Sequence, residues 1–261
     1  MAPILHCVRH AQGEHNKGGD AYLIHDPRLT EAGIAECKAL ESRFPYQSSI
    51  ELIVSSPLRR AVQTALCSFQ PAINRGVKIV VLPELQETSD VACDTGSEVS
   101  KLEEEFGGIV GPQGKVVDLS LLDENWHVKR GRFAPSSNAI IARARDARKW
   151  LKARPEKEVA VVSHGGFLHY FTQDWTGIGE EEHASAWENC DFRSYEFTVT
   201  DGDSDGDATL VETHASRAAR GVADQRIPTK EEQHAYYLRT MEMWERRGFQ
   251  NPLKLNEVFG T

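Results

Sequence analysis

The 261-residue sequence predicts a three-layer α/β/α sandwich with a mostly parallel central sheet. Short, apolar, β-branched runs alternate with amphipathic helical patterns, which is typical of strands whose connecting helices cover both faces of a parallel sheet. Two of the apolar runs end abruptly, at Arg9-His10 and at Ser163-His164. Ligands of such folds bind beyond the carboxyl ends of the strands, so these two ends indicate a site. The length favours a single domain over residues 1–261, with a cap inserted at approximately 88–135.

The first third of the chain contains three predicted strands and two predicted helices. The strands are short apolar runs that read as buried strands of a parallel sheet. Thr30 is a plausible N-cap for the first helix, in which Ile34, Cys37, Leu40 and Phe44 follow at helical spacing. In chain order the predicted strands are 4–8, 51–55 and 77–82, and the second helix is 58–69.

The remainder of the chain is less regular at first. Between 88 and 135 the sequence is rich in Gly, Asp and Glu, and only residues 99–106 have a clear helical pattern. Regular elements then return, namely helices at 138–151, 167–175 and 229–247 and strands at 158–162, 195–200 and 208–213. The packing partner of the last helix cannot be read from the sequence.

Composition indicates a soluble intracellular protein, expected in the cytoplasm. The net charge of −9 argues against nucleic acid or an anionic membrane as a main partner and leaves room for a local basic pocket that binds a small phosphorylated metabolite. The five cysteines are scattered and contain no Cys-x-x-Cys pair, as expected for free thiols in a reducing compartment. We find neither a secretory signal pattern nor an apolar run of about 20 residues. The oligomeric state is not indicated.

The residue types needed for phosphoryl transfer occur at successive predicted strand ends. A neutral imidazole can attack phosphorus near neutral pH, and arginine binds phosphoryl oxygens bidentately without losing its charge. His10 and His164 each follow a strand, an Arg59-Arg60 pair opens a helix, and Glu87 follows the third strand. Each feature alone is more often structural, and it is their joint placement that indicates a site.

Four ordered motifs resemble those of the histidine phosphatase superfamily, the phosphoglycerate mutase-like proteins. They are Val8-Arg9-His10-Ala11-Gln12-Gly13-Glu14-His15-Asn16, Ser55-Ser56-Pro57-Leu58-Arg59-Arg60-Ala61, Leu82-Pro83-Glu84-Leu85-Gln86-Glu87 and Val161-Val162-Ser163-His164-Gly165-Gly166.

The resemblance implies a role for each matched residue. His10 is the phosphorylated nucleophile, Glu87 the acid that protonates the leaving oxygen, and the phosphoryl oxygens are held by Arg9, Arg60 and His164. We also expect substrate contacts from Asn16, Gly165 and Arg59. The resemblance implies no metal and no organic cofactor, so the enzyme is expected to be metal-independent.

Some positions depart from the family pattern. Ala11 replaces the usual glycine, and Thr88-Ser89-Asp90 lacks the aromatic-glycine pair that often follows the acid, which leaves nearby Glu84 as an alternative. The segment after His10 also lacks the Glu-Ser-x-x-Asn sequence that cofactor-dependent mutases favour. We therefore predict a phosphatase that hydrolyses a small phosphomonoester. The alternatives are a phosphomutase and a non-catalytic phospho-ligand-binding protein.

Three further patterns occur in the sequence. The acidic run 201–206 with Glu212 satisfies the EF-hand spacing, but predicted strands flank it, so a solvated hairpin turn is favoured. The histidine spacings fit no common zinc motif. A basic group in the predicted cap is either a solvated patch or a set of substrate-selecting side chains above an anion site, namely Trp126, Lys129, Arg130 and Arg132.

Overall fold

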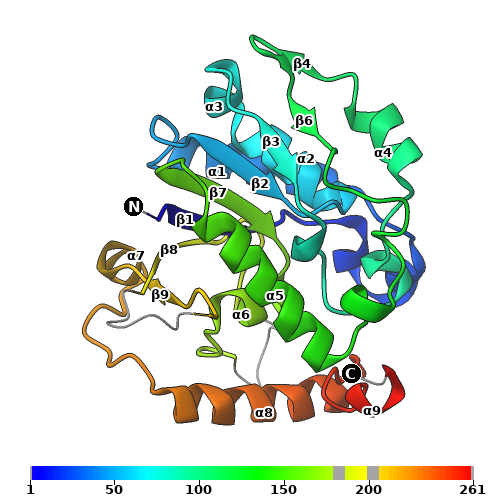
Figure 1. The fold of residues 1–261 in the computed structure, drawn as a ribbon, viewed down its shortest axis with the longest axis vertical. Coiled ribbons are helices and arrows are strands. Elements are labelled where there is room, and N and C mark those ends of the chain that lie inside the picture. Colours follow the sequence, from blue (N-terminus) through cyan, green and yellow to red (C-terminus); the bar gives the residue numbers. More distant parts are fainter. Residues whose placement is uncertain (1, 179–185, 199–205, 260–261) are drawn as a thin grey trace.

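The computed structural model describes residues 2–178, 186–198 and 206–259. Its main sheet has the strand order β6-β3-β2-β7-β1-β8-β9. The parallel strands are β1 (Ile4–Arg9), β2 (Leu52–Ser55), β3 (Ile79–Val81), β6 (Val117–Asp118) and β7 (Glu158–Ser163). The antiparallel strands β8 (Phe192–Phe197) and β9 (Leu210–Glu212) complete one edge (Figure 1).

Helices cover both faces of this sheet, which confirms the three-layer prediction. One face packs against α1 (Glu31–Arg43), α2 (Arg59–Ser68), α3 (Gln70–Asn74) and α4 (Val99–Phe106). The other packs against α5 (Ser137–Lys152), α6 (Gly165–Thr172) and α8 (Lys230–Arg246).

Strand β7 shows how the sequence divides the two cores. Val159 and Val161 belong to the cluster on the α5 and α6 side, whereas Ala160 and Val162 belong to the cluster on the α1 and α2 side. Successive side chains of a strand point to opposite faces, so a continuous apolar run buries both faces of the strand.

The helix boundaries have local causes. The Thr30 hydroxyl accepts a hydrogen bond from the Gly33 amide at 3.0 Å, which confirms Thr30 as the N-cap of α1. Helix α6 ends at Thr172, earlier than predicted, because Gln173 adopts a left-handed conformation with φ of 59°.

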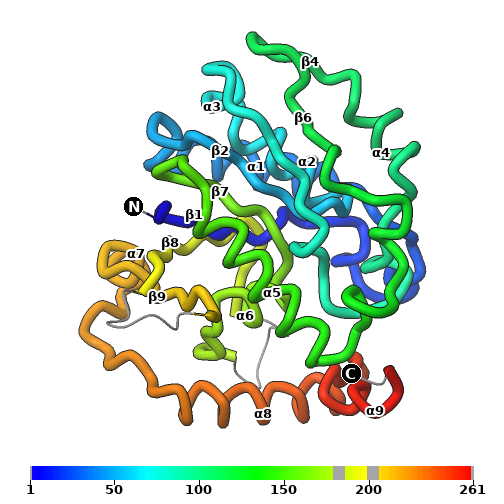
Figure 2. Tube along the Cα trace, viewed as in Figure 1, coloured from blue at the N-terminus to red at the C-terminus, as the bar shows by residue number. Residues whose placement is uncertain are grey.

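The packing partner of α8 is the end of α6 and the residues after it. Tyr237 lies with its ring centroid 4.9 Å from that of Trp175 and 6.0 Å from that of Tyr170. Trp244, two helical turns later, lies 6.4 Å from Trp175. In Figure 2 the trace from β9 continues through α7 (His214–Ala219) into α8, which lies below α5 and α6, and ends at α9 (Asn256–Phe259).

The segment 88–135 only partly lies over the sheet. It contains the short helix η4 (Ala92–Asp94), α4, the hairpin of β4 (Val110–Gly111) and β5 (Gly114–Lys115), and the short helix η5 (Gly131–Phe133). Its strand β6 pairs with β3 and extends the main sheet, and this strand was not predicted from the sequence.

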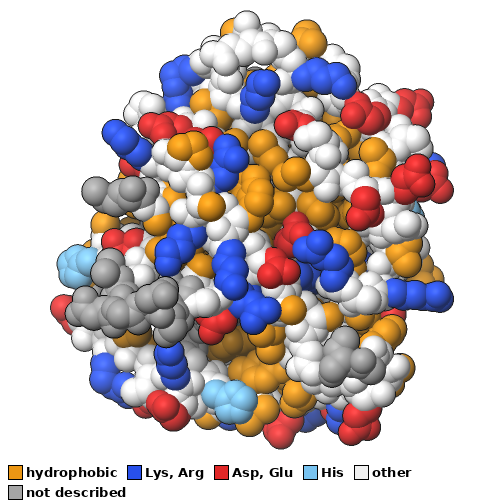
Figure 3. Space-filling view, in the orientation of Figure 1, with side chains coloured by type: hydrophobic (Ala, Val, Ile, Leu, Met, Phe, Trp, Pro, Cys, Tyr) orange, Lys and Arg blue, Asp and Glu red, His pale blue; other side chains and the backbone are white. Residues whose placement is uncertain are grey.

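Strands β8 and β9 pair in antiparallel register, as expected for the two strands predicted around the acidic run. Residues 201–205 of that run lie outside the described residues. Among the residues described, no helix is both long and apolar enough to cross a membrane. Figure 3 shows basic and acidic side chains interspersed on one face of the molecule, with Lys and Arg gathered over its middle.

Candidate active site

His10 and His164 meet at the carboxyl edge of the sheet because β1 and β7 are paired in register. Arg9 lies opposite Ser163, and the His10 amide donates to the Ser163 carbonyl at 2.9 Å. Each histidine is the next residue after its strand, so the two imidazole centroids lie 5.1 Å apart. The strand pairing alone therefore brings together two residues that are far apart in the sequence.

The orientation of the His10 ring fixes which nitrogen can react. Nδ1 lies 2.7 Å from the Ala11 carbonyl oxygen, which can only accept, so Nδ1 carries the proton and Nε2 the lone pair. Arg60 Nε donates to Nε2 at 3.2 Å. Burial, followed by the nearby Arg60 and Arg9 guanidinium groups, lowers the pKa of His10 well below its ordinary value. His10 is thus a neutral imidazole with Nε2 facing a cation.

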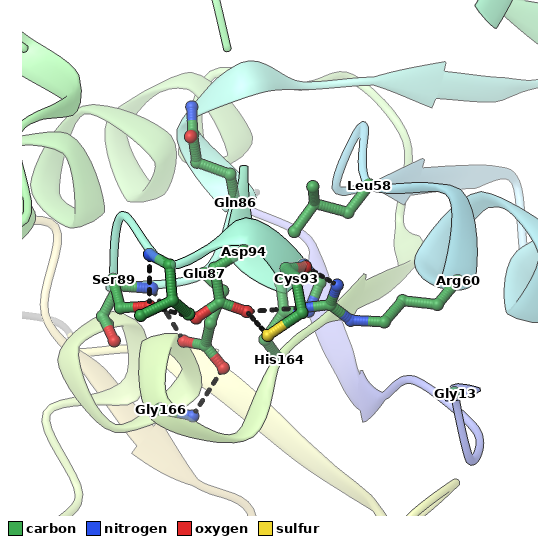
Figure 4. A network of polar contacts seen from close by, with 12 residues as sticks. Gly13, Leu58, Arg60, Gln86, Glu87, Ser89, Cys93, Asp94, His164 and Gly166 are labelled. Carbon is green, nitrogen blue, oxygen red and sulfur yellow. Dashed lines mark hydrogen bonds and ion pairs between the residues drawn. The ribbon is translucent and has the colours of Figure 1, made fainter. Parts of the chain in front are cut away.

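Arg60 is fully buried and is held by the loop around η4 (Figure 4). Its Nη1 donates to the Cys93 carbonyl at 2.5 Å, and its Nη2 donates to Asp94 Oδ1 at 2.9 Å. The other oxygen of Asp94 accepts from the Ser89 hydroxyl at 2.5 Å. These contacts fix the guanidinium plane and direct its Nε toward His10.

Three buried polar atoms near His10 have no hydrogen-bond partner among the described residues, and one of them is Nδ1 of His15. His164 Nε2 lies 2.7 Å from the Ser56 hydroxyl, whereas its Nδ1 has no partner. Arg9 donates through Nη1 to the Trp187 carbonyl, whereas its Nε has no partner. Burial, with Arg60 and His10 nearby, lowers the pKa of His164 well below its usual value. Buried polar atoms without a partner are uncommon in proteins. A bound oxyanion could accept hydrogen bonds from His164 Nδ1 and Arg9 Nε.

Glu87 lies at the N-terminus of α6, where its carboxylate accepts hydrogen bonds from helix amides. Gly166 N donates at 3.2 Å and Phe167 N at 2.8 Å. Burial and the Asp94 carboxylate raise the pKa of Glu87, against the opposing effect of Arg60. The alternative acid, Glu84, instead pairs with Arg132.

Two buried cations support the Glu87 segment. Arg143 of α5 donates to the backbone carbonyls of Glu84, Gln86 and Glu87 at 2.7, 2.6 and 2.9 Å. Lys129 Nζ donates to the same Glu87 carbonyl at 3.1 Å. The loop that carries Glu87 is therefore held from α5 and from the insertion at once.

Three predicted substrate contacts have other surroundings in the structure. Arg59 pairs with Glu105 of α4 at 2.9 Å, and exposed Asn16 accepts from the Gly13 amide at 3.0 Å in the short helix η1 (Glu14–Lys17). Gly165 is the first residue of α6. Their contact with substrate stays a prediction.

Four side chains of this site were not singled out from the sequence. Arg143 had a signal, since it interrupts the apolar stripe of a strongly amphipathic helix. The ring centroid of buried His15 lies 5.5 Å from that of His10. Ser56 contacts His164, and Asp94 contacts Arg60. No sequence pattern distinguished these three.

The described part of the chain contains no group of three or more His, Cys, Asp or Glu residues arranged to hold a metal ion. The site is instead a set of imidazole, guanidinium and carboxyl groups around His10 Nε2. Such a set can hold a phosphoryl group, supply a nucleophile and supply a proton.

The sequence of this chain matches a known protein family. Residues 5–204 match the model of the histidine phosphatase superfamily, branch 1. The chain is 30% identical over 172 residues to "Probable phosphatase SPAC513.02" of Schizosaccharomyces pombe, covering 64% of this chain and 76% of that protein. It is 28% identical over 231 residues to a phosphoglycerate mutase-like protein of Arabidopsis thaliana, covering 73% and 82%.

A solved structure agrees at the level of the fold. The ecdysone phosphate phosphatase from Bombix mori superposes with a TM-score of 0.51 at 15% identity, covering 74% of this chain and 89% of that one. The ordered motifs, the parallel sheet and the match over residues 5–204 agree with one another. This chain belongs to the histidine phosphatase superfamily.

Proposed function

We propose that the chain is a phosphatase that hydrolyses a small phosphomonoester through a phosphohistidine on His10. The observation that carries the proposal is the neutral His10 ring, whose Nε2 faces Arg60 while its Nδ1 proton is held by the Ala11 carbonyl. The family and the phosphatase name of the S. pombe relative support phosphatase chemistry.

In the first step Nε2 of His10 attacks phosphorus. The new P–N bond forms as the bond between phosphorus and the ester oxygen breaks, and Glu87 gives its proton to that oxygen. Arg9, Arg60 and His164 would bind the three non-bridging oxygens, which would satisfy the unpaired Arg9 Nε and His164 Nδ1. The raised pKa of Glu87 suits it to be protonated before this step.

In the second step water attacks the phosphohistidine. The now ionised Glu87 takes a proton from water, the P–N bond breaks, and His10 leaves as a neutral imidazole. Inorganic phosphate is the product and Glu87 is protonated again. No metal ion takes part, so activity is expected to persist in excess chelator.

Rapid quenching with a phosphomonoester labelled in its phosphorus tests this proposal. Wild type and the exposed-histidine control His25→Ala should both accumulate acid-labile, alkali-stable label and release phosphate in chelator. His10→Ala should do neither while keeping its thermal unfolding temperature near that of wild type. Phosphate release that survives in His10→Ala would refute the mechanism, and an isomerised phosphoester as product would indicate a mutase.

A further inference from the structure

Lys129 is a buried cation for which the described residues provide no counter-ion. Its side chain belongs to a residue that is 8% exposed, and Nζ donates to the neutral Glu87 carbonyl at 3.1 Å. No carboxylate of the described chain lies within 4.0 Å of Nζ. Buried ammonium groups are usually paired, because removal from water strongly disfavours the charged form.

The surroundings of Lys129 are themselves short of negative charge. Arg143 Nη2 donates to the same Glu87 carbonyl at 2.9 Å, so two cationic side chains share one neutral acceptor. Burial and Arg143 lower the pKa of Lys129 to about 7, while Asp94 and Glu87 oppose this from farther away. An anion arriving beside Nζ would favour the charged form and gain a charge-assisted hydrogen bond.

The position of Lys129 is fixed by buried packing contacts of the residues before it. Trp126, three residues earlier, is fully buried, and its carbonyl accepts from Gln86 Nε2 at 3.1 Å. Its indole lies against Gly96, where an added Cβ would come within 1.9 Å of Trp126 Cη2. The backbone before Lys129 is therefore packed against the segment that carries Glu87.

Lys129 lies on the Glu87 side of the site. In the proposed mechanism the phosphoryl oxygens bind Arg9, Arg60 and His164, whereas Glu87 meets the ester oxygen of the leaving alcohol. A cation that contacts the Glu87 backbone is placed to meet a group on that alcohol. This reasoning rests on the proposed function.

We propose that Lys129 determines specificity by binding a second anionic group, a carboxylate or a phosphate, on the alcohol part of the substrate near the ester oxygen. The preferred substrates are then small phosphomonoesters whose leaving alcohol is itself an anion. Simple alkyl phosphates bind through the phosphoryl group alone.

Three two-carbon substrates test the proposal, namely 2-phosphoglycolate, ethylene glycol bisphosphate and 2-hydroxyethyl phosphate, and the alcohol part of the last carries no charge. Wild type should have a higher kcat/KM for at least one of the two anionic esters than for 2-hydroxyethyl phosphate, and the better one identifies the anion. Lys129→Met also loses a contact to the Glu87 loop, which affects all substrates alike, so it should lower the value for the anionic ester about 10- to 100-fold more than the value for 2-hydroxyethyl phosphate. The control Lys101→Met, an exposed lysine of the same insertion, should match wild type for every substrate.

Two results would overturn the proposal. One is an equal loss in Lys129→Met for the anionic esters and for 2-hydroxyethyl phosphate, which would mean that Lys129 holds the phosphoryl group or the loop. The other is the lack of any preference in wild type. Hydrolysis of 4-nitrophenyl phosphate, which has no second anionic group, is measured in parallel. Absence of this activity in wild type would contradict the proposed phosphatase function itself rather than the role of Lys129.

A pH series keeps the test informative if Lys129→Met does not fold. The charged and titratable groups near Lys129 are Arg143 of α5, Arg60 of α2, Asp94 of η4, His164 before α6, and Glu87. The preference of wild type for the anionic ester should fall between pH 6 and 9 as Lys129 loses its proton. Lys129→Arg keeps its charge and should hold the preference over this range, and an identical decline in both proteins would contradict the proposal.

Discussion

Replacing Gly166 by alanine should displace the carboxylate of Glu87, the proposed acid, without replacing that residue. A Cβ at this position would lie 2.8 Å from Glu87 Oε1 and 3.3 Å from the Glu87 carboxyl carbon. Ordinary contacts of this kind begin near 3.4 Å, so the carboxylate has to move by about 0.6 Å. The movement would also weaken its hydrogen bonds from the Gly166 and Phe167 amides, which are 3.2 and 2.8 Å long.

The expected result is a loss of turnover that depends on the leaving group. A misplacement of about 1 Å can lower a rate about 100-fold, so we expect kcat for an alkyl phosphate to fall about 10- to 100-fold. The fall should be smaller for 4-nitrophenyl phosphate, whose leaving oxygen needs little protonation. Stability should stay near that of wild type, because alanine favours the helix by about 1 kcal/mol over glycine.

The assay is steady-state kcat with both substrates, with Gly108→Ala as the matched control. Gly108 has no atom within 4 Å of an added Cβ and no positive φ, so this variant should equal wild type. Unchanged alkyl phosphate turnover in Gly166→Ala would refute the reasoning. An equal loss with both substrates would show that Glu87 does not act on the leaving oxygen.

Three other perturbations test the electrostatics and the packing. Asp94→Asn keeps an acceptor for Arg60 but removes a negative charge that helps to raise the pKa of Glu87. The decline of kcat at high pH should therefore occur at lower pH than in wild type, and an unchanged pH profile would contradict this. Burial lowers the pKa of His15 to about 2, so as the pH falls below about 6.5 the His15 ring takes up a proton in the unfolded chain but not in the folded one. The free energy of unfolding should therefore be about 2 kcal/mol lower at pH 5.0 than at pH 7.5. Urea unfolding at pH 7.5 and 5.0 measures that loss, and His15→Asn should show correspondingly less of it. Arg143→Met leaves the buried carbonyls of Glu84 and Gln86 without this donor, while the Glu87 carbonyl keeps Lys129, and it should lower the free energy of unfolding by about 3 kcal/mol or more. Exposed Arg145→Met should change it by less than about 0.5 kcal/mol.

The sequence predicted the parts of the molecule that depend on local pattern. Continuous apolar runs predicted β1, β2, β3 and β7, because both faces of those strands are buried. The placement of His10 and His164 at two strand ends predicted their meeting, because parallel strands share an edge. Strand β6 was missed because two residues are too short to carry a periodic pattern.

The parts that depend on tertiary contact could not be predicted in the same way. For Lys129 the sequence left open a solvated patch or a substrate-selecting side chain, and it did not single out Asp94. Both residues reach the site from an irregular segment, where Arg60, Trp126 and Gly96 set their positions. The sequence could not predict which of Glu87 and Glu84 accepts hydrogen bonds from the α6 amides, because that depends on how their loop packs against α6. The contacts of α8 with Trp175 likewise follow from the path of the whole chain.

The central place of β7 has a consequence for how the molecule acquires its activity. Strand β1 pairs with β7 across 154 residues of sequence, as in Ile4 with Glu158, and β2 reaches β1 only through β7. A nascent chain that stops before residue 158 holds His10 and Arg60 but lacks the strand that aligns them. Contacts so distant in sequence form slowly. During synthesis, catalytic competence should therefore appear as one late event, after β7 is inserted between strands that were made long before it.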